Sequence, residues 1–136
     1  MILVDSSVWI DYFNGKASWQ TDLLDQCLSD FPIIMGDLIL TEVLQGFKSD
    51  RDFETAKSFL DGLPFRQMGG YDIAVQSAEN YRKLRKTGIT VRKTIDVIIA
   101  TFCIAEGFTL LHDDHDFEPI AGLFPLKTCA PGKAVI

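Results

Sequence analysis

Short apolar runs alternate with helical segments along this chain, and this alternation restricts the fold more than any other feature. The runs ILV at 2–4, PIIM at 32–35 and FTLLH at 108–112 are rich in β-branched or aliphatic residues and too brief to be core helices. Longer stretches with helical periodicity separate them. Strands that are joined through helices predict an α/β fold with a mainly parallel central sheet.

The stretches around these runs carry further signals of secondary structure. Asp37 and Asp50 are suited to cap the helices that follow them. LPFRQM at 63–68 predicts another short strand, and the segment with Phe124 and Leu126 predicts a strand at the edge of the sheet. Helices are predicted in five regions, around 23–28, 37–47, 50–63, 71–87 and 94–106.

Composition limits the class of protein. Of the 136 residues 47% are hydrophobic and 24% are charged, which is typical of one globular domain, here residues 1–136. No basic leader precedes the first apolar residues and no apolar run reaches membrane-spanning length, so we expect a cytoplasmic protein without a membrane partner. The spacing of Cys27, Cys103 and Cys129 predicts reduced core thiols. The net charge of −6 argues against indiscriminate binding of nucleic acids.

Carboxylates directly follow two of the predicted strands. Asp5 ends the first strand, and the cluster HDDHD at 112–116 follows FTLL. Open parallel sheets bind ligands beyond the carboxyl ends of their strands, so these acids are predicted to meet at one edge of the sheet. For Asp5 alone the simpler interpretation is a helix N-cap, a task that Ser6 or Ser7 can share.

Two further acids lie near predicted junctions between strands and helices. Asp96 interrupts the apolar stretch TIDVIIATFCIAEG in its first turn, where an acid also complements the helix dipole. Glu42 lies in LILTEVLQGF, where a surface position is the simpler interpretation. If these acids converge with Asp5 and Asp114, their mutual repulsion makes the group stable mainly around a cation. Oxygen ligands favour Mg²⁺ or Mn²⁺, and such ions assist phosphoryl transfer.

The ordered set of acidic motifs resembles the PIN-domain ribonucleases, and among them the VapC toxins of bacterial toxin–antitoxin pairs. The matching stretches are VDSSVWIDYF, LTEVLQG, TIDVIIA and LLHDDHDFEPIA. The resemblance implies a three-layer α/β/α PIN-like domain with a mainly parallel central sheet. It also implies four catalytic acids that form the metal site, namely Asp5, Glu42, Asp96 and Asp114. Asp116 is implied as an additional metal-site acid, and Ser7 as a supporting hydroxyl that positions ligand oxygens or water.

The same resemblance implies a metal-dependent endoribonuclease toxin that uses Mg²⁺ or Mn²⁺. Similar toxins often cut structured RNA such as tRNA, and the family implies a homodimer and inhibition by a VapB-like antitoxin whose tail covers the acidic pocket. Trp9, Phe13 and Trp19 are candidate antitoxin contacts, with core packing as the alternative for each. A non-catalytic PIN-fold module that binds RNA or protein is the alternative function. A phosphatase of the haloacid dehalogenase type would need a second acid where this chain has Ser7.

One segment departs from the pattern of such toxins. His112 stands where they more often carry a small polar residue, and Asp113 adds a charge, so either Asp114 or Asp116 can be the fourth metal-site acid. Alternation along an extended segment turns Asp114 and Asp116 to one side and Asp113 away. His112 and His115 as transition-metal ligands are the less favoured interpretation, because no matching Cys or His lies elsewhere in the sequence.

Basic charge is concentrated just before Asp96. Six of the 13 basic residues fall in a segment of twelve residues, and this segment predicts either contacts with an RNA backbone or a solvated helix end. The six are Arg82, Lys83, Arg85, Lys86, Arg92 and Lys93.

Overall fold

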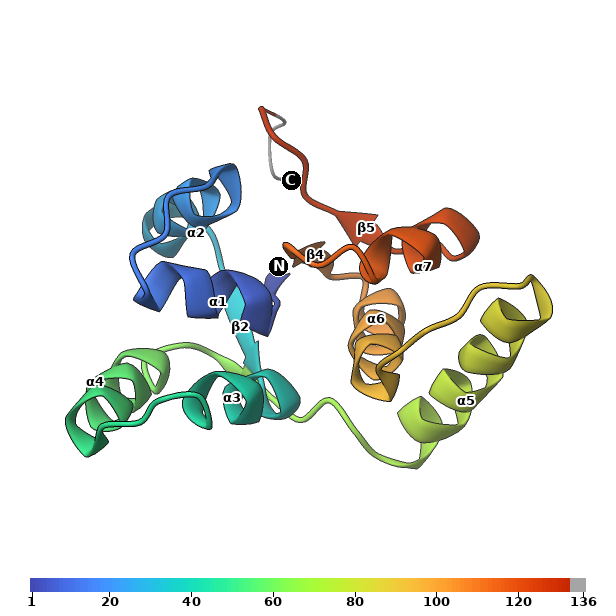
Figure 1. Cartoon of the computed structure of the whole chain (residues 1–136), viewed down its shortest axis with the longest axis horizontal. Coiled ribbons are helices and arrows are strands. Elements are labelled where there is room, and N and C mark those ends of the chain that lie inside the picture. The colour runs from blue at the N-terminus through green and yellow to red at the C-terminus, as the bar shows by residue number, and fades with distance from the viewer. Residues whose placement is uncertain (133–136) are drawn as a thin grey trace.

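A five-stranded parallel sheet forms the centre of the protein (Figure 1). The structure is a computed structural model, and it describes residues 1–132. The strands are β1 (Ile2–Val4), β2 (Ile33–Gly36), β3 (Phe65–Arg66), β4 (Thr109–Leu111) and β5 (Lys127–Thr128), in the spatial order β3-β2-β1-β4-β5. The predicted α/β fold with a mainly parallel sheet is confirmed.

Helices cover both faces of this sheet. Helices α1 to α4 pack against one another on one side, and α5 to α7 pack against one another on the other side (Figure 1). Among residues 1–132, no helix combines the length and the apolar character needed to cross a membrane. The helices are α1 (Ser6–Phe13), α2 (Trp19–Asp30), α3 (Asp37–Leu44), α4 (Asp50–Leu60), α5 (Tyr71–Lys86), α6 (Thr94–Glu106) and α7 (Phe117–Leu123).

The order of the strands determines where a site can form. From β1 the chain moves outward through β2 to β3, and it then returns through α5 and α6 to place β4 on the other side of β1. The direction of winding therefore reverses between β1 and β4, which is where open α/β sheets bind their ligands. Val4 pairs with Leu111, and the amide of Asp5 donates to the carbonyl of Leu111 at 2.8 Å. Asp5 and the segment 112–116 thus start from the same point of the same edge.

Helix α6 is buried on almost every side and carries one acid, Asp96, in its first turn. It lies between the sheet, α5 and α7, which explains why the sequence TIDVIIATFCIAE is apolar on almost every side. Val97, Ile99, Ala100 and Phe102 on this helix are each at most 1% exposed. Asp96 is a carboxylate within this buried helix and is itself only 3% exposed, which makes its position costly unless a partner compensates the charge.

Several predicted boundaries are wrong by small amounts. The N-cap of α3 is Gly36 rather than Asp37, and the N-cap of α4 is Ser49 rather than Asp50, because the Ser49 hydroxyl accepts from the amide of Asp52 at 3.0 Å. The edge strand β5 begins at Lys127, beyond the predicted Phe124 and Leu126. Helix α7 was not predicted, since its seven residues bury only Phe117 and Ile120 and give almost no periodic signal.

Gly36 lets β2 approach the segment that leads into α5, and replacing it should destabilise the fold. Its backbone is extended, but a Cβ atom there would overlap the Sδ and Cγ atoms of the fully buried Met68. We expect Gly36→Ala to lower the free energy of unfolding by about 1–3 kcal/mol, as overpacking does. Urea denaturation measures this change. The control is Gly122→Ala in α7, where the added methyl meets open space and should not destabilise.

Candidate active site

Asp5 is both a helix cap and a buried acid. It is the N-cap of α1 and is 3% exposed. Its Oδ2 atom accepts hydrogen bonds from the backbone amide of Ser7 at 3.1 Å and from the Ser7 hydroxyl at 2.6 Å. Burial raises the pKa of the Asp5 carboxyl, the two bonds from Ser7 oppose this rise, and the charge of Asp114 adds to it. The cap therefore explains the position of one carboxylate oxygen, Oδ2. It does not remove the energetic cost of burying the negative charge.

Ser7 also joins the two strand ends. Its hydroxyl oxygen donates to Asp5 and accepts a hydrogen bond from the backbone amide of Asp113 at 3.1 Å. The segment that follows β4 is thereby attached to the start of α1, although the two are more than a hundred residues apart in sequence. Ser7 is placed to fix the position of Asp5 relative to the acids of segment 112–116.

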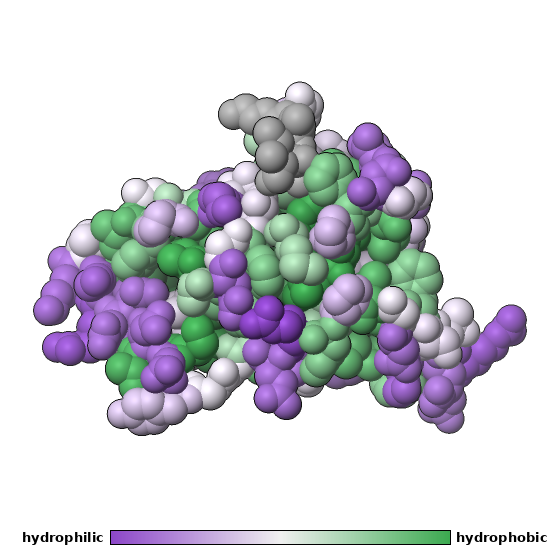
Figure 2. Space-filling model, turned by 180° about the vertical axis from the view of Figure 1, so that it is seen from behind, coloured by the Kyte–Doolittle hydropathy of each residue, from purple (hydrophilic) through white to green (hydrophobic). Residues whose placement is uncertain are grey.

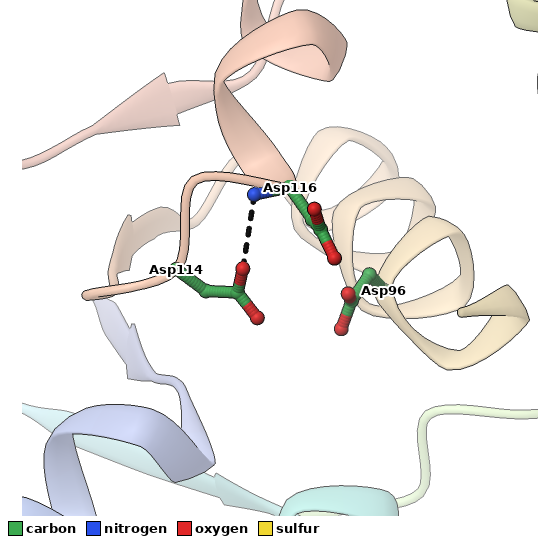
Figure 3. Close-up of side chains that lie close together, drawn as sticks. All are labelled: Asp96, Asp114 and Asp116. Atoms are coloured by element: carbon green, nitrogen blue, oxygen red, sulfur yellow. Dashed lines mark hydrogen bonds between the residues drawn. The ribbon is translucent and has the colours of Figure 1, made fainter. Parts of the chain in front are cut away.

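Three carboxylates converge at this edge (Figure 3). Asp96 comes from the first turn of α6, Asp114 from the loop after β4, and Asp116 from the start of α7. Each offers one oxygen atom, and these atoms lie within 4.8 Å of one another. The amide of Asp116 donates to Oδ1 of Asp114 at 2.9 Å, which holds the loop in this shape. Asp113 lies apart from them, with its carboxylate 3.9 Å from Nζ of Lys16.

Two members of this group each have a carboxylate oxygen without a hydrogen-bond partner. Oδ2 of Asp96 and Oδ2 of Asp116 are buried without one. Burial, together with the charges of Asp114 and Asp5, raises the pKa of Asp96 to about 6 against the opposing effect of Lys93. Buried carboxylate oxygens that face one another fit a hard divalent cation, because such an ion supplies both the missing partner and the compensating charge. The residues present are therefore suited to hold Mg²⁺ or Mn²⁺.

Glu42 lies beside this group rather than within it. It is half-buried on α3, and its Oε1 atom accepts a hydrogen bond from the Ser6 hydroxyl at 3.1 Å. Burial raises the pKa of Glu42, and the charge of Asp5 raises it further. The structure thus brings Glu42 close enough to Asp5 and Asp114 to interact with both charges, while the tight group of three consists of Asp96, Asp114 and Asp116.

The basic segment divides into two parts with different surroundings. Nζ of Lys93 lies 3.0 Å from Oδ2 of Asp114 and 3.6 Å from Oδ2 of Asp96, and Arg92 lies 3.3 Å from Oδ1 of Asp116. The other four basic residues are exposed on the last turns of α5, and none of them forms an ion pair with another described residue. Hydrophilic residues gather on that side of the molecule in the rear view (Figure 2). Sequence reasoning grouped all six together and missed the contacts of Arg92 and Lys93 with the acids.

The match to known proteins covers almost the whole chain. The family model described as PIN domain matches residues 2–123. Ribonuclease VapC11 of Mycobacterium tuberculosis is 32% identical over 132 residues, which cover 96% of this chain and 98% of that relative. This chain is a PIN domain protein of the VapC family.

Solved structures agree with this family assignment at the level of the fold. The VapBC2 complex of Rickettsia felis, bound to a DNA fragment from its promoter, contains a chain with a TM-score of 0.75 and 18% identity, covering 94% of the present chain and 97% of that chain. VapBC-1 of nontypeable Haemophilus influenzae contains one with a TM-score of 0.73 and 17% identity, covering 98% and 100%. The expected three-layer α/β/α PIN-like architecture is confirmed.

The two histidines of this VapC-family chain have different surroundings. Nδ1 of His112 accepts a hydrogen bond from the amide of Asp114 at 3.3 Å, and burial lowers the pKa of His112, which favours the neutral ring that this bond requires. His115 is exposed and contacts Glu118. Within residues 1–132, neither histidine belongs to a group of three close metal-ligand side chains.

The aromatic candidates and the cysteines of this PIN domain lie in the hydrophobic core or pack against it. Trp9 is fully buried and stacks on Phe13 with ring centroids 5.9 Å apart, so it is not available as an antitoxin contact, whereas Phe13 and Trp19 are partly buried. The three cysteines are free thiols, and burial raises the pKa of Cys103 to about 12. Thiol chemistry is therefore disfavoured, as the spacing of the cysteines predicted.

Proposed function

We propose that this VapC-family PIN domain is a metal-dependent endoribonuclease toxin. The observation that carries the proposal is the convergence of Asp96, Asp114 and Asp116, two of them with buried oxygens that lack a partner, at the switch point between β1 and β4. Acids arranged in this way are stabilised by a hard divalent ion. The name of the relative at 32% identity, a ribonuclease, supports RNA as the substrate.

Each acid of the site has a proposed role. Asp96, Asp114 and Asp116 would hold Mg²⁺ or Mn²⁺ together with Asp5, while Glu42 would act directly or through water. An ion of this kind polarises a phosphodiester and lowers the pKa of a bound water. Ser7 holds the Asp5 carboxylate through its hydroxyl and ties it to the loop that carries Asp114. The contribution of the protein to catalysis would be to hold these oxygens in place before RNA binds.

The binding of RNA by an acidic protein needs a local basic surface. The exposed basic residues on the last turns of α5 are proposed to contact the RNA backbone, and Arg92 and Lys93 extend this surface to the acids. Structured RNA such as tRNA is the proposed substrate, cut to leave a 5′-phosphate and a 3′-hydroxyl. Inhibition by a VapB-like antitoxin is proposed because similar folds occur in VapBC structures. A homodimer and a cytoplasmic location are proposed only because the resemblance to VapC toxins implies them.

Removal of the metal tests this function directly. The purified protein is incubated with total tRNA in Mg²⁺ or Mn²⁺, with and without excess chelator, and the RNA ends are sequenced. We expect cleavage with the divalent ion and a loss of at least about a hundredfold in rate with chelator, because the acids alone repel the phosphate. Cleavage that continues in chelator would contradict the proposal. Binding of RNA without cleavage under any metal condition would favour the non-catalytic module.

A further inference from the structure

Lys93 places a cation among the acids that are proposed to bind metal. Its Nζ atom lies between two carboxylates that belong to different elements, 3.0 Å from Oδ2 of Asp114 and 3.6 Å from Oδ2 of Asp96. Both are members of the tight group of three, and Oδ2 of Asp96 has no hydrogen-bond partner. The longer of the two distances is an ion pair without a hydrogen bond, so Lys93 compensates this group only in part.

The backbone of Lys93 is fixed, whereas its charged end is accessible. The residue is the N-cap of α6 with an extended backbone, and its carbonyl accepts from the amide of Asp96 at 3.2 Å. Its side chain is 51% exposed and makes no capping bond. A flexible four-carbon stem at the rim of the site lets the ammonium group exchange one oxygen partner for another at little cost.

Building on the proposed function, we infer that Lys93 is an internal counter-ion of the metal-free site, which leaves the acids to a divalent ion and then binds the RNA phosphate. The ammonium group and a divalent cation need the same carboxylate oxygens, so their binding is competitive. If these oxygens held a divalent ion, they would no longer need Lys93 as their counter-ion, and its ammonium group would be free to bind the phosphate of RNA. The group then lies within reach of the reacting phosphodiester, where a cation stabilises developing negative charge.

Arg92 fits this role less well than Lys93. It contacts one oxygen of one acid, Oδ1 of Asp116, at 3.3 Å, and its side chain is 78% exposed. An ion pair with such exposure contributes little to stability and competes weakly with a metal. The structure therefore assigns the counter-ion role to Lys93, and it leaves Arg92 on the basic surface.

The test compares two readouts that should change in opposite directions. In Lys93→Met, we expect Mn²⁺, titrated by calorimetry without RNA, to bind on the order of tenfold tighter, because a neighbouring cation that opposes the ion has been removed. The kcat/KM for tRNA cleavage should fall by at least about tenfold, because the phosphate loses a positive partner. Lys93→Arg keeps the charge and should return both values toward the wild type. The control is Lys57→Met, which removes a lysine of α4 that pairs with Asp61. It should change neither Mn²⁺ binding nor tRNA cleavage.

The outcomes separate this inference from the function on which it rests. Unchanged or weaker Mn²⁺ binding in Lys93→Met, with the wild type binding the ion, would overturn the counter-ion role and leave the nuclease proposal intact. Tighter binding with unchanged cleavage would overturn the phosphate role. If wild-type protein binds no Mn²⁺ and cuts no RNA, the proposed function fails and Lys93 has no metal to compete with. A circular dichroism spectrum of each variant checks that its fold is kept.

Discussion

Asp96→Asn is expected to abolish RNA cleavage and at the same time to stabilise the metal-free protein. Cleavage should fall on the order of a thousandfold, because the change removes a proposed anionic metal ligand that would act as a unit with the other acids. Stability should rise because Asp96 is a nearly buried acid whose Oδ2 atom has no hydrogen-bond partner. An ordinary core residue would respond differently, since its replacement would reduce stability and activity together.

The gain in stability should depend on pH. Burial raises the pKa of Asp96 to about 6, so the folded protein holds this proton at pH values where the unfolded chain, with a pKa near 4, has already lost it. Wild-type stability contributed by this group is therefore greatest below about pH 4, declines as pH rises to about 6 and stays low above it. Asp96→Asn should be more stable than wild type by about 1–3 kcal/mol above pH 6, with no advantage below pH 4.

Urea denaturation in chelator at pH 4 and pH 7, beside tRNA cleavage in Mn²⁺, measures both effects of Asp96→Asn. Asp113→Asn is the matched control, because Asp113 lies in the same loop as Asp114 but has its carboxylate near Lys16. The control should retain cleavage. Equal cleavage by Asp96→Asn and wild type, or a loss of stability at pH 7, would contradict a repelling acidic site at this position.

A pair of substitutions at Asp5 should separate its two roles. Asn keeps a side-chain oxygen that accepts from the amide of Ser7, whereas Ala removes both this cap and the charge. We expect both variants to lose cleavage on the order of a thousandfold, because both lose the anionic oxygen that Asp5 is proposed to offer to the metal. Asp5→Ala should also be less stable than Asp5→Asn by about 1 kcal/mol, which is the usual contribution of an N-cap.

Thermal unfolding and tRNA cleavage of the two Asp5 variants are the measurements. Asp50→Asn and Asp50→Ala, at the exposed start of α4, form the control pair, since Ser49 rather than Asp50 caps that helix. This pair should retain cleavage and differ little in stability. If Asp5→Asn cleaves RNA as wild type does, Asp5 is a cap alone, and the simpler interpretation of its sequence position is the correct one.

Sequence alone was sufficient for the features that depend on local pattern. The apolar runs at 2–4 and 108–112 became central strands because chains with this pattern bury both faces of a strand. The position of Asp5 and of segment 112–116 after those strands then followed from the common direction of a parallel sheet. Short elements with few buried residues were harder, and α7 was missed because Phe117 and Ile120 are its only buried side chains.

The sequence by itself determined the α/β alternation and the edge of the sheet at which acids gather. Only the tertiary structure decided that Asp114 and Asp116 both face Asp96, that Glu42 stands beside this group, and that Lys93 enters it. The physical reason lies in the range of the two kinds of information. Hydrophobic periodicity records which side of each element is buried, whereas distances between side chains on separate elements depend on loop paths and rotamers that are fixed only when the whole core packs.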